Sequence, residues 1–270
     1  MDYKKILATF LVVFLMIDAF LALQWIQLKP SFLNPTSNDS VLTEMRNDGI
    51  QVSKVDNGSH TGVYLAGRAG SAYLRRHVGD LSNRWTTRFA DNQLTVTLDE
   101  PISLANKGTT VQRELERLLV DGTKVIGGTR YQFNQKLTDY ANQTTDDVQV
   151  MVFTQRISQK RKFITPQAQI RFMISHNHHL LSYTQTYVAN PQILRDATVL
   201  LSEKKALLAA YQYNEIPNNS QVNWGQLGYV VLTTVKKDII FVPAWTFSIT
   251  NAAGEVSIVH INALNGALMP

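Results

Sequence analysis

One apolar stretch near the amino terminus constrains the fold of this chain more than any other feature. Residues Ile6 to Leu23 are apolar except for Thr9 and Asp18. The run is 18 residues long and its apolar character continues to Leu28, close to the roughly 20 residues that a helix needs to cross a bilayer. The sequence therefore predicts one N-terminal transmembrane helix.

A cleaved secretion signal is the alternative interpretation of this stretch. The apolar core of a signal is usually about 7–15 residues long and leads to a small-x-small cleavage site. Here Phe20 lies two positions before Ala22, and Ile17 lies two positions before Ala19. Neither site suits a signal peptidase, so we expect an uncleaved anchor.

The charges that flank the apolar run predict its orientation. Lys4 and Lys5 precede the run, whereas only Lys29 follows it closely before the acidic Asp39 and Glu44. Because positively charged flanks stay in the cytoplasm, the short N-terminus is expected inside and the rest of the chain outside. The expected location is the cell membrane, with a single pass and an extracellular main domain.

The remaining sequence predicts an α+β fold. Hydrophobic residues make up 44% of the chain and charged residues 17%, as expected for a globular domain with a core. Runs of strands interrupted by single helices favour two extracytoplasmic lobes, each an antiparallel sheet with a packed helix. The polar run at 142–147 is the candidate boundary between them. The predicted organisation is 1–28 cytoplasmic stub and transmembrane anchor, 29–40 polar linker, 41–145 N-terminal lobe and 146–270 C-terminal lobe.

Individual elements follow from residue periodicity and turn signals. For the first lobe we predict a hairpin over Arg84–Leu98 that turns at Asp91-Asn92, a helix from Thr109 or Thr110 to Gly122, and a strand over Arg130–Leu137. For the second lobe we predict strands over 148–157, 168–175 and 180–189, a helix over Pro191–Tyr213, and strands over 227–235, 239–250 and 255–264, the last two joined by a turn ending at Gly254.

The sequence carries no motif that indicates catalysis. Cysteine is absent, which excludes disulfides, thiol nucleophiles and sites with cysteine ligands. The segment 58–62 resembles a nucleophile elbow, but its serine is in the wrong place. Ser202 and Lys205 match S-x-x-K, and the S-D-N and K-T-G elements that complete such a site are missing. We therefore predict a protein that is not an enzyme, with no catalytic residue and no cofactor.

Three histidines form the best candidate for a metal site. His176, His178 and His179 fall at an expected turn between two strands. Neighbouring side chains alternate between faces there, so at most two of them converge, whereas zinc needs three or four ligands. We interpret them as turn histidines and predict no metal.

No binding site is predicted at the charged clusters or the aromatic residues. The net charge of +5 lies outside the anchor, and Arg75-Arg76 and Lys160–Lys162 are interpreted as solvated faces. A patterned basic and aromatic surface is missing, so no nucleic-acid partner is predicted. Trp224, Tyr229 and Trp245 are interpreted as core or interface residues.

Three segments at the two ends of the chain carry a family resemblance. The start MDYKKILATFLVVFLMIDAFLALQ, with its short basic lead and single span with a late polar residue, resembles the start of the YycI family. The segment LLSEKKALLAAYQYNEIPNNSQV resembles the family's passage from a helix into strands, and FVPAWTFSITNAAGEVSIVHINALNG its terminal sheet. The stretch Ser40–Val125 carries no part of the resemblance.

The resemblance implies a function that the residues alone do not. YycI proteins are bitopic regulators of the WalK/YycG sensor histidine kinase, which controls cell-wall metabolism, and they act together with YycH. The expected partners are therefore such a kinase, a YycH-like membrane protein and the membrane itself. The alternative is a PepSY-like extracytoplasmic binding or inhibitor module unrelated to a kinase, because the C-terminal ending also resembles PepSY domains.

Asp18 is the one residue that this function singles out. A carboxylate at the centre of a span costs about 2.5–3.5 kcal/mol on translocon scales, which the surrounding apolar residues offset. It either carries its proton or snorkels toward the interface, or it hydrogen-bonds a neighbouring transmembrane helix for a gain of about 0.6–2 kcal/mol. Of the two, we favour the contact and predict Asp18 as a transmembrane partner residue.

Overall fold

The computed structural model describes residues 3–27, 35–52, 55–56, 58–82, 84–105, 108–145, 148–158 and 161–270. These ranges contain six α-helices and several β-sheets, so the predicted α+β class is confirmed. The chain divides into two compact units, Met1–Thr43 and Glu44–Pro270.

The first unit holds the apolar stretch Ile6–Leu23. Residues Tyr3–Gln27 form one helix, α1, and helix α2 covers Pro35–Asn47 and extends into the second unit. Of the linker predicted over 29–40, residues 29–34 lie outside the described residues, and 35–40 are helical rather than irregular. Among the described residues, no helix meets the length and hydropathy that crossing a membrane requires. The N-terminal transmembrane helix therefore stays a prediction.

The second unit contains a six-stranded sheet whose neighbouring strands all pair antiparallel. Its strands come from one continuous part of the chain, residues 85–185. In spatial order they are β4 (Trp85–Ala90), β5 (Gln93–Ser103), β9 (His179–Gln185), β8 (Gln169–Ile174), β7 (Gln149–Gln155) and β6 (Tyr131–Phe133).

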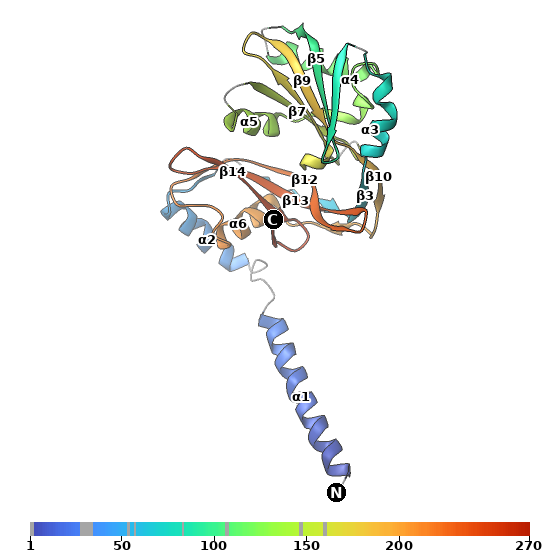
Figure 1. The fold of residues 1–270 in the computed structure, drawn as a ribbon. Helices are drawn as coiled ribbons and strands as arrows, with labels where there is room; N and C mark the ends of the chain where they lie inside the picture. Colours follow the sequence, from blue (N-terminus) through green and yellow to red (C-terminus); the bar gives the residue numbers. More distant parts are fainter. Residues whose placement is uncertain are drawn as a thin grey trace. The chain divides into compact units, whose positions relative to one another are not determined.

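Local sequence signals account for much of this sheet. The predicted hairpin is confirmed, and Asp91 and Asn92 have the positive φ values of 46° and 64° that favour a tight two-residue turn. The predicted helix is α4 (Gly108–Val120), which buries Val111, Leu115 and Leu119 against the sheet. Helix α3 (Ser71–His77) covers the same core, and both helices lie along the six-stranded sheet in Figure 1.

The prediction over Arg130–Leu137 is only partly right. Strand β6 ends at Phe133, and helix α5 (Gln135–Gln143) follows, with the side chain of Asn134 accepting the Leu137 N–H at 3.3 Å. Leu137 and Ala141 share a core cluster with Val152 of β7 and with the second sheet. Helix α5 therefore lies between the two sheets (Figure 1), a placement that no local pattern indicates.

A seven-stranded sheet completes the second unit. It combines β1 (Gln51–Val52), β12 (Gln221–Val235), β13 (Asp238–Thr250), β14 (Val256–Asn262) and β15 (Leu268–Met269) with β3 (Leu65–Ala69) and β10 (Val188–Ile193). Strand β3 pairs with both β10 and β13, and β1 pairs parallel with β12, which departs from the purely antiparallel sheet that we expected. Strands β2 (Thr61–Gly62) and β11 (Thr198–Val199) form a separate pair.

The six-stranded sheet is thus inserted in the chain between β3 and β10. The predicted lobe boundary at 145/146 falls between α5 and β7, within the stretch that builds this sheet. Strands of the six-stranded sheet therefore lie on both sides of that boundary.

The helix predicted to open at Pro191 is wrong in its first half. Residues 188–193 form β10, and helix α6 begins only at Glu203 and ends at Gln212. Asn190 has a φ of 49°, and β10 gains antiparallel hydrogen bonds from β3, more than a hundred residues earlier. Pairing at that distance overrides the local helical pattern. Helix α6 packs on the seven-stranded sheet (Figure 1).

Candidate binding cleft

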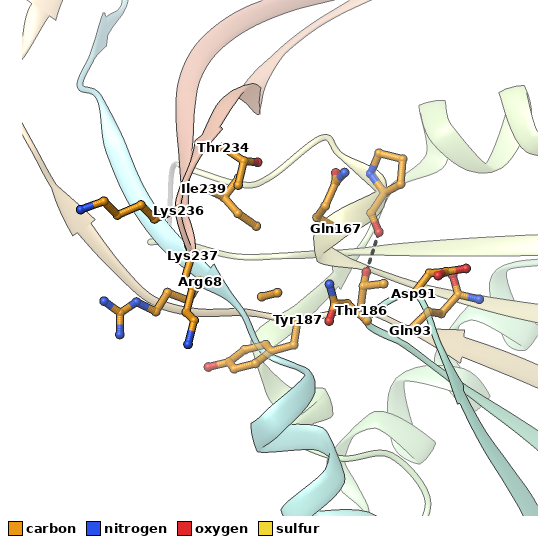
Figure 2. Close-up of a pocket in the computed structure, with 13 residues that line it drawn as sticks. Arg68, Asp91, Gln93, Gln167, Thr186, Tyr187, Thr234, Lys236, Lys237 and Ile239 are labelled. Carbon is orange, nitrogen blue, oxygen red and sulfur yellow. Dashed lines mark hydrogen bonds between the residues drawn. The ribbon is translucent and has the colours of Figure 1, made fainter.

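A cavity of about 590 Å³ lies where the two sheets of the second unit meet. Five separate segments supply its walls, as Figure 2 shows: β3, the β4–β5 turn, the 3-10 turn Pro166–Ala168, the link between β9 and β10, and the β12–β13 hairpin. Its lining residues are Arg68, Ala69, Asp91, Asn92, Gln93, Pro166, Gln167, Thr186, Tyr187, Thr234, Lys236, Lys237 and Ile239.

Positive charge gathers along one side of this cleft. Arg68, Lys236 and Lys237 lie together in Figure 2, opposite Asp91 and Gln93. The Nε of Arg68 donates to Oδ1 of Asp238 at 2.6 Å, and this hydrogen bond, with the attraction of the carboxylate, raises the pKa of Arg68. Asp238 neutralises the charge of Arg68. Among the lining residues, the net positive charge on this side of the cleft therefore comes from Lys236 and Lys237.

The lysines sit at the tip of the β12–β13 hairpin. Lys236 and Lys237 connect Val235 to its partner Asp238, and Lys236 has a φ of 58°. A lysine rarely adopts this left-handed conformation, which glycine or asparagine tolerates better. The hairpin therefore presents two exposed ammonium groups on a backbone that is locally strained.

Tyr187 and Thr186 form a more rigid wall. A Cβ added to Gly70 would lie 2.3 Å from the Tyr187 ring, and Tyr187 also hydrogen-bonds Arg130. The Thr186 hydroxyl donates to the Pro166 carbonyl at 2.6 Å, drawn as a dashed line in Figure 2. This wall therefore offers polar groups in fixed positions.

Asp18 lies in α1 with an exposed side chain. Its assignment as a transmembrane partner residue stays a prediction.

The histidine cluster occupies the turn between β8 and β9. His176 is exposed, His178 has a φ of 59°, and His179 begins β9 with its N–H donating to the Ser175 hydroxyl at 3.1 Å. Within the described ranges, no three His, Asp or Glu side chains are placed to hold a metal ion. The turn interpretation thus fits their position.

The S-x-x-K match has a structural role, although not in the middle of a helix as expected. Ser202 is the N-cap of α6, and its side chain accepts the N–H of Lys205 at 3.4 Å. Serine is a preferred N-cap because its oxygen satisfies a free N–H of the first turn. The spacing is therefore that of a helix cap.

The aromatic residues behave as core residues. Tyr229 and Trp245 are both 3% exposed, and the Trp245 indole donates to the Leu201 carbonyl at 2.8 Å. Trp224 is partly buried against the cluster that contains α5. The cleft is not among the sequence predictions. The strands predicted over 227–235 and 239–250 do bracket the Lys236-Lys237 turn that lines it, and they are the signal that could have indicated one of its walls.

Two solved structures resemble the chain at low sequence identity. An uncharacterized protein from Eubacterium rectale ATCC 33656 is 10% identical, with a TM-score of 0.46, over 83% of this chain and 91% of that one. The Bacillus megaterium YpeB C-terminal domain is 11% identical, with a TM-score of 0.35, over 88% and 96% of the respective chains. These scores are too low to support a conclusion.

The comparison with curated proteins gives no significant match. By contrast, the sequence model of the YycI protein family matches residues 31–264. This match covers the larger part of the chain, including the strands that line the cleft. The chain therefore belongs to the YycI family.

Proposed function

We propose that this protein is a non-enzymatic regulator of the two-component system that controls cell-wall metabolism. It modulates a sensor histidine kinase of the WalK/YycG type through transmembrane and extracytoplasmic contacts with the kinase and a YycH-like partner. The observation that carries the proposal is the family match over residues 31–264, since YycI proteins are associated with such a kinase. The same match supports a membrane-anchored protein with its main domain outside the cell.

Helix α1 is the proposed anchor. Its sequence is apolar over Ile6–Leu23, and its described large apolar side chains, from Leu7 to Leu21, are exposed. A long set of exposed apolar side chains requires a nonpolar partner, which a bilayer supplies. In this proposal the anchor packs beside the spans of the kinase and the YycH-like protein, and the external unit sets the geometry of that bundle.

The decisive experiment replaces Ile6–Leu23 with an unrelated poly-leucine span. Such a span keeps the protein in the membrane but removes its specific helix contacts, so regulation of kinase autophosphorylation should be lost at unchanged expression. In-membrane crosslinking to the kinase, measured on the same cells, should also disappear. Regulation that persists with the poly-leucine span contradicts a transmembrane mechanism, and the absence of any crosslink from the natural protein favours the PepSY-like alternative.

Asp18 tests the same proposal at one side chain. Asp18→Leu should reduce co-purification with the partner spans by about 3- to 30-fold, the equivalent of one interhelical hydrogen bond. Met16→Leu, an apolar exchange in the same helix, is the matched control and should change nothing. An equal yield of complex from both variants contradicts the proposed contact.

A further inference from the structure

A second pocket of about 420 Å³ lies apart from the cleft, where the segment 161–164 runs beside β12 through a parallel bridge between Phe163 and Tyr229. Its walls come from residues 59–61, residues 161–162, Leu200, β12 and β13. The lining residues are Ser59, His60, Thr61, Arg161, Lys162, Leu200, Leu227, Gly228, Tyr229 and Pro243. Three of these carry or can gain a positive charge, and none carries a carboxylate.

Lys162 departs from its expected place on a solvated face. Its side chain is partly buried, and it forms no ion pair within the ranges that the structure describes. Burial lowers the pKa of Lys162, and the nearby charge of Lys136 lowers it further. The Lys162 ammonium group is partly removed from water and is repelled by a second positive charge. An anion that binds beside it therefore stabilises it.

The backbone fixes the position of Lys162. The Tyr229 N–H donates to the Lys162 carbonyl at 3.0 Å, and the Ile164 N–H donates to the Tyr229 carbonyl at 2.8 Å. A Cβ on Gly228 would lie 2.3 Å from the Ile164 side chain, so the two segments are tightly packed here. The main chain of Lys162 is therefore fixed beside the pocket.

The neighbouring carboxylate of Asp56 is already engaged. Its Oδ2 lies 3.0 Å from Nε2 of His60, and its Oδ1 accepts the Gly58 N–H at 2.6 Å. These interactions lower the pKa of Asp56 and orient the imidazole of His60, which also packs edge-on against Trp245. Among the described ion pairs, none joins Asp56 to Arg161 or Lys162.

We propose that this pocket binds an oxyanion, a phosphate or carboxylate group of a small molecule, between Lys162, Arg161 and His60. Phosphate and carboxylate oxygens form short, charge-assisted hydrogen bonds with ammonium and guanidinium donors. The larger cleft is a poorer candidate because the carboxylate of Asp91 lines it, whereas no carboxylate lines this pocket. This inference does not depend on the kinase partnership.

Isothermal titration of the full-length chain in detergent tests the inference, with inorganic phosphate and citrate as separate probes. Ionic strength is held constant with chloride. Saturable binding of either probe is expected, and the probe that binds more tightly identifies whether the pocket prefers phosphate or carboxylate. Binding of neither probe above the chloride background overturns the proposal.

Substitutions locate the site. Lys162→Gln should weaken binding at least about tenfold, whereas Lys162→Arg, which keeps the charge, should retain most of it. Arg117→Gln removes one positive charge from the exposed face of α4, away from both pockets, and should leave binding unaltered. An equal loss in Lys162→Gln and Arg117→Gln, or a complete loss in a folded Lys162→Arg variant, overturns the assignment. Thermal unfolding of each variant verifies that it is folded.

Discussion

The two sheets of the second unit are built in different ways. The six-stranded sheet uses residues 85–185 in one continuous stretch, and each of its neighbouring strands runs antiparallel. The seven-stranded sheet collects strands from Gln51 to Met269 and includes a parallel pair. Short connections let local turn and periodicity signals specify the first sheet, whereas the second depends on contacts between distant segments.

Their interiors are alike in one respect. The cluster beneath α3 and α4 is apolar, with Leu115, Phe153 and Phe172 fully buried. Both sheets nevertheless bury polar side chains as well, which are Thr154, Gln155 and Gln185 in the six-stranded sheet and Thr246, Ser248 and Asn262 in the seven-stranded one. The two sheets therefore differ in how their strands are assembled along the chain rather than in the kind of side chain that they bury.

The largest effect is expected in the apolar core of the six-stranded sheet. Leu115→Ala removes a fully buried side chain and should lower the free energy of unfolding by about 2–5 kcal/mol. Val120→Ala in the same helix removes a side chain that is 71% exposed and should change it by less than about 0.5 kcal/mol. Urea denaturation measures both, and similar losses contradict the assigned faces of α4.

A smaller effect is expected where the segment 161–164 runs beside β12 of the seven-stranded sheet. Gly228→Ala places a Cβ 2.3 Å from the side chain of buried Ile164, and this overpacking should cost about 1–3 kcal/mol. Gly79→Ala is the control, because a Cβ there meets nothing within 4 Å. Urea denaturation measures the stability of both variants. A Gly228→Ala variant that is as stable as the control contradicts tight packing between Gly228 and Ile164.

Buried polar pairing gives the next effect. Glu203 is 7% exposed and accepts the Asp56 N–H at 2.7 Å. Glu203→Gln keeps an acceptor of the same shape but removes its charge, so a loss of about 1 kcal/mol is expected. Glu100→Gln, whose side chain is 82% exposed, should be nearly neutral. Equal stability of the two variants indicates that the buried hydrogen bond contributes nothing.

The smallest effect is a dependence on pH that belongs to the seven-stranded sheet. His260 lies in β14, 2.9 Å from the Thr246 hydroxyl, and burial lowers its pKa. The unfolded chain therefore binds a proton at this residue before the folded chain does, and stability should fall as the pH drops below about 6.5. His260→Gln should flatten this part of the profile, measured by thermal unfolding between about pH 7.5 and 5.5. An unchanged profile excludes His260 as its cause.

The sequence predictions were right where the structure of a segment depends on residues close to it in the chain. The Asp91-Asn92 turn, helix α4, the first two strands after residue 148 and the turn at Gly254 appear as predicted. The strand predicted over 180–189 ends at Gln185, and its last two residues belong to β10 of the other sheet. Helix α5 was missed because it packs against β13, and residues 191–199 were misread because they pair with β3 and β2. The cleft was missed for the same reason, since five segments spread over the chain supply its walls.

The sequence by itself determined the family, the α+β class, and the apolar N-terminal stretch that makes a membrane anchor the natural proposal. Those features depend on residue type and near-neighbour order, which the chain carries directly. Only the tertiary structure decided that one sheet is inserted into the other, that Asp238 neutralises Arg68, and that Lys162 lies partly buried without a described counter-charge. Burial and charge pairing arise when distant segments meet, and no single stretch of sequence encodes that meeting.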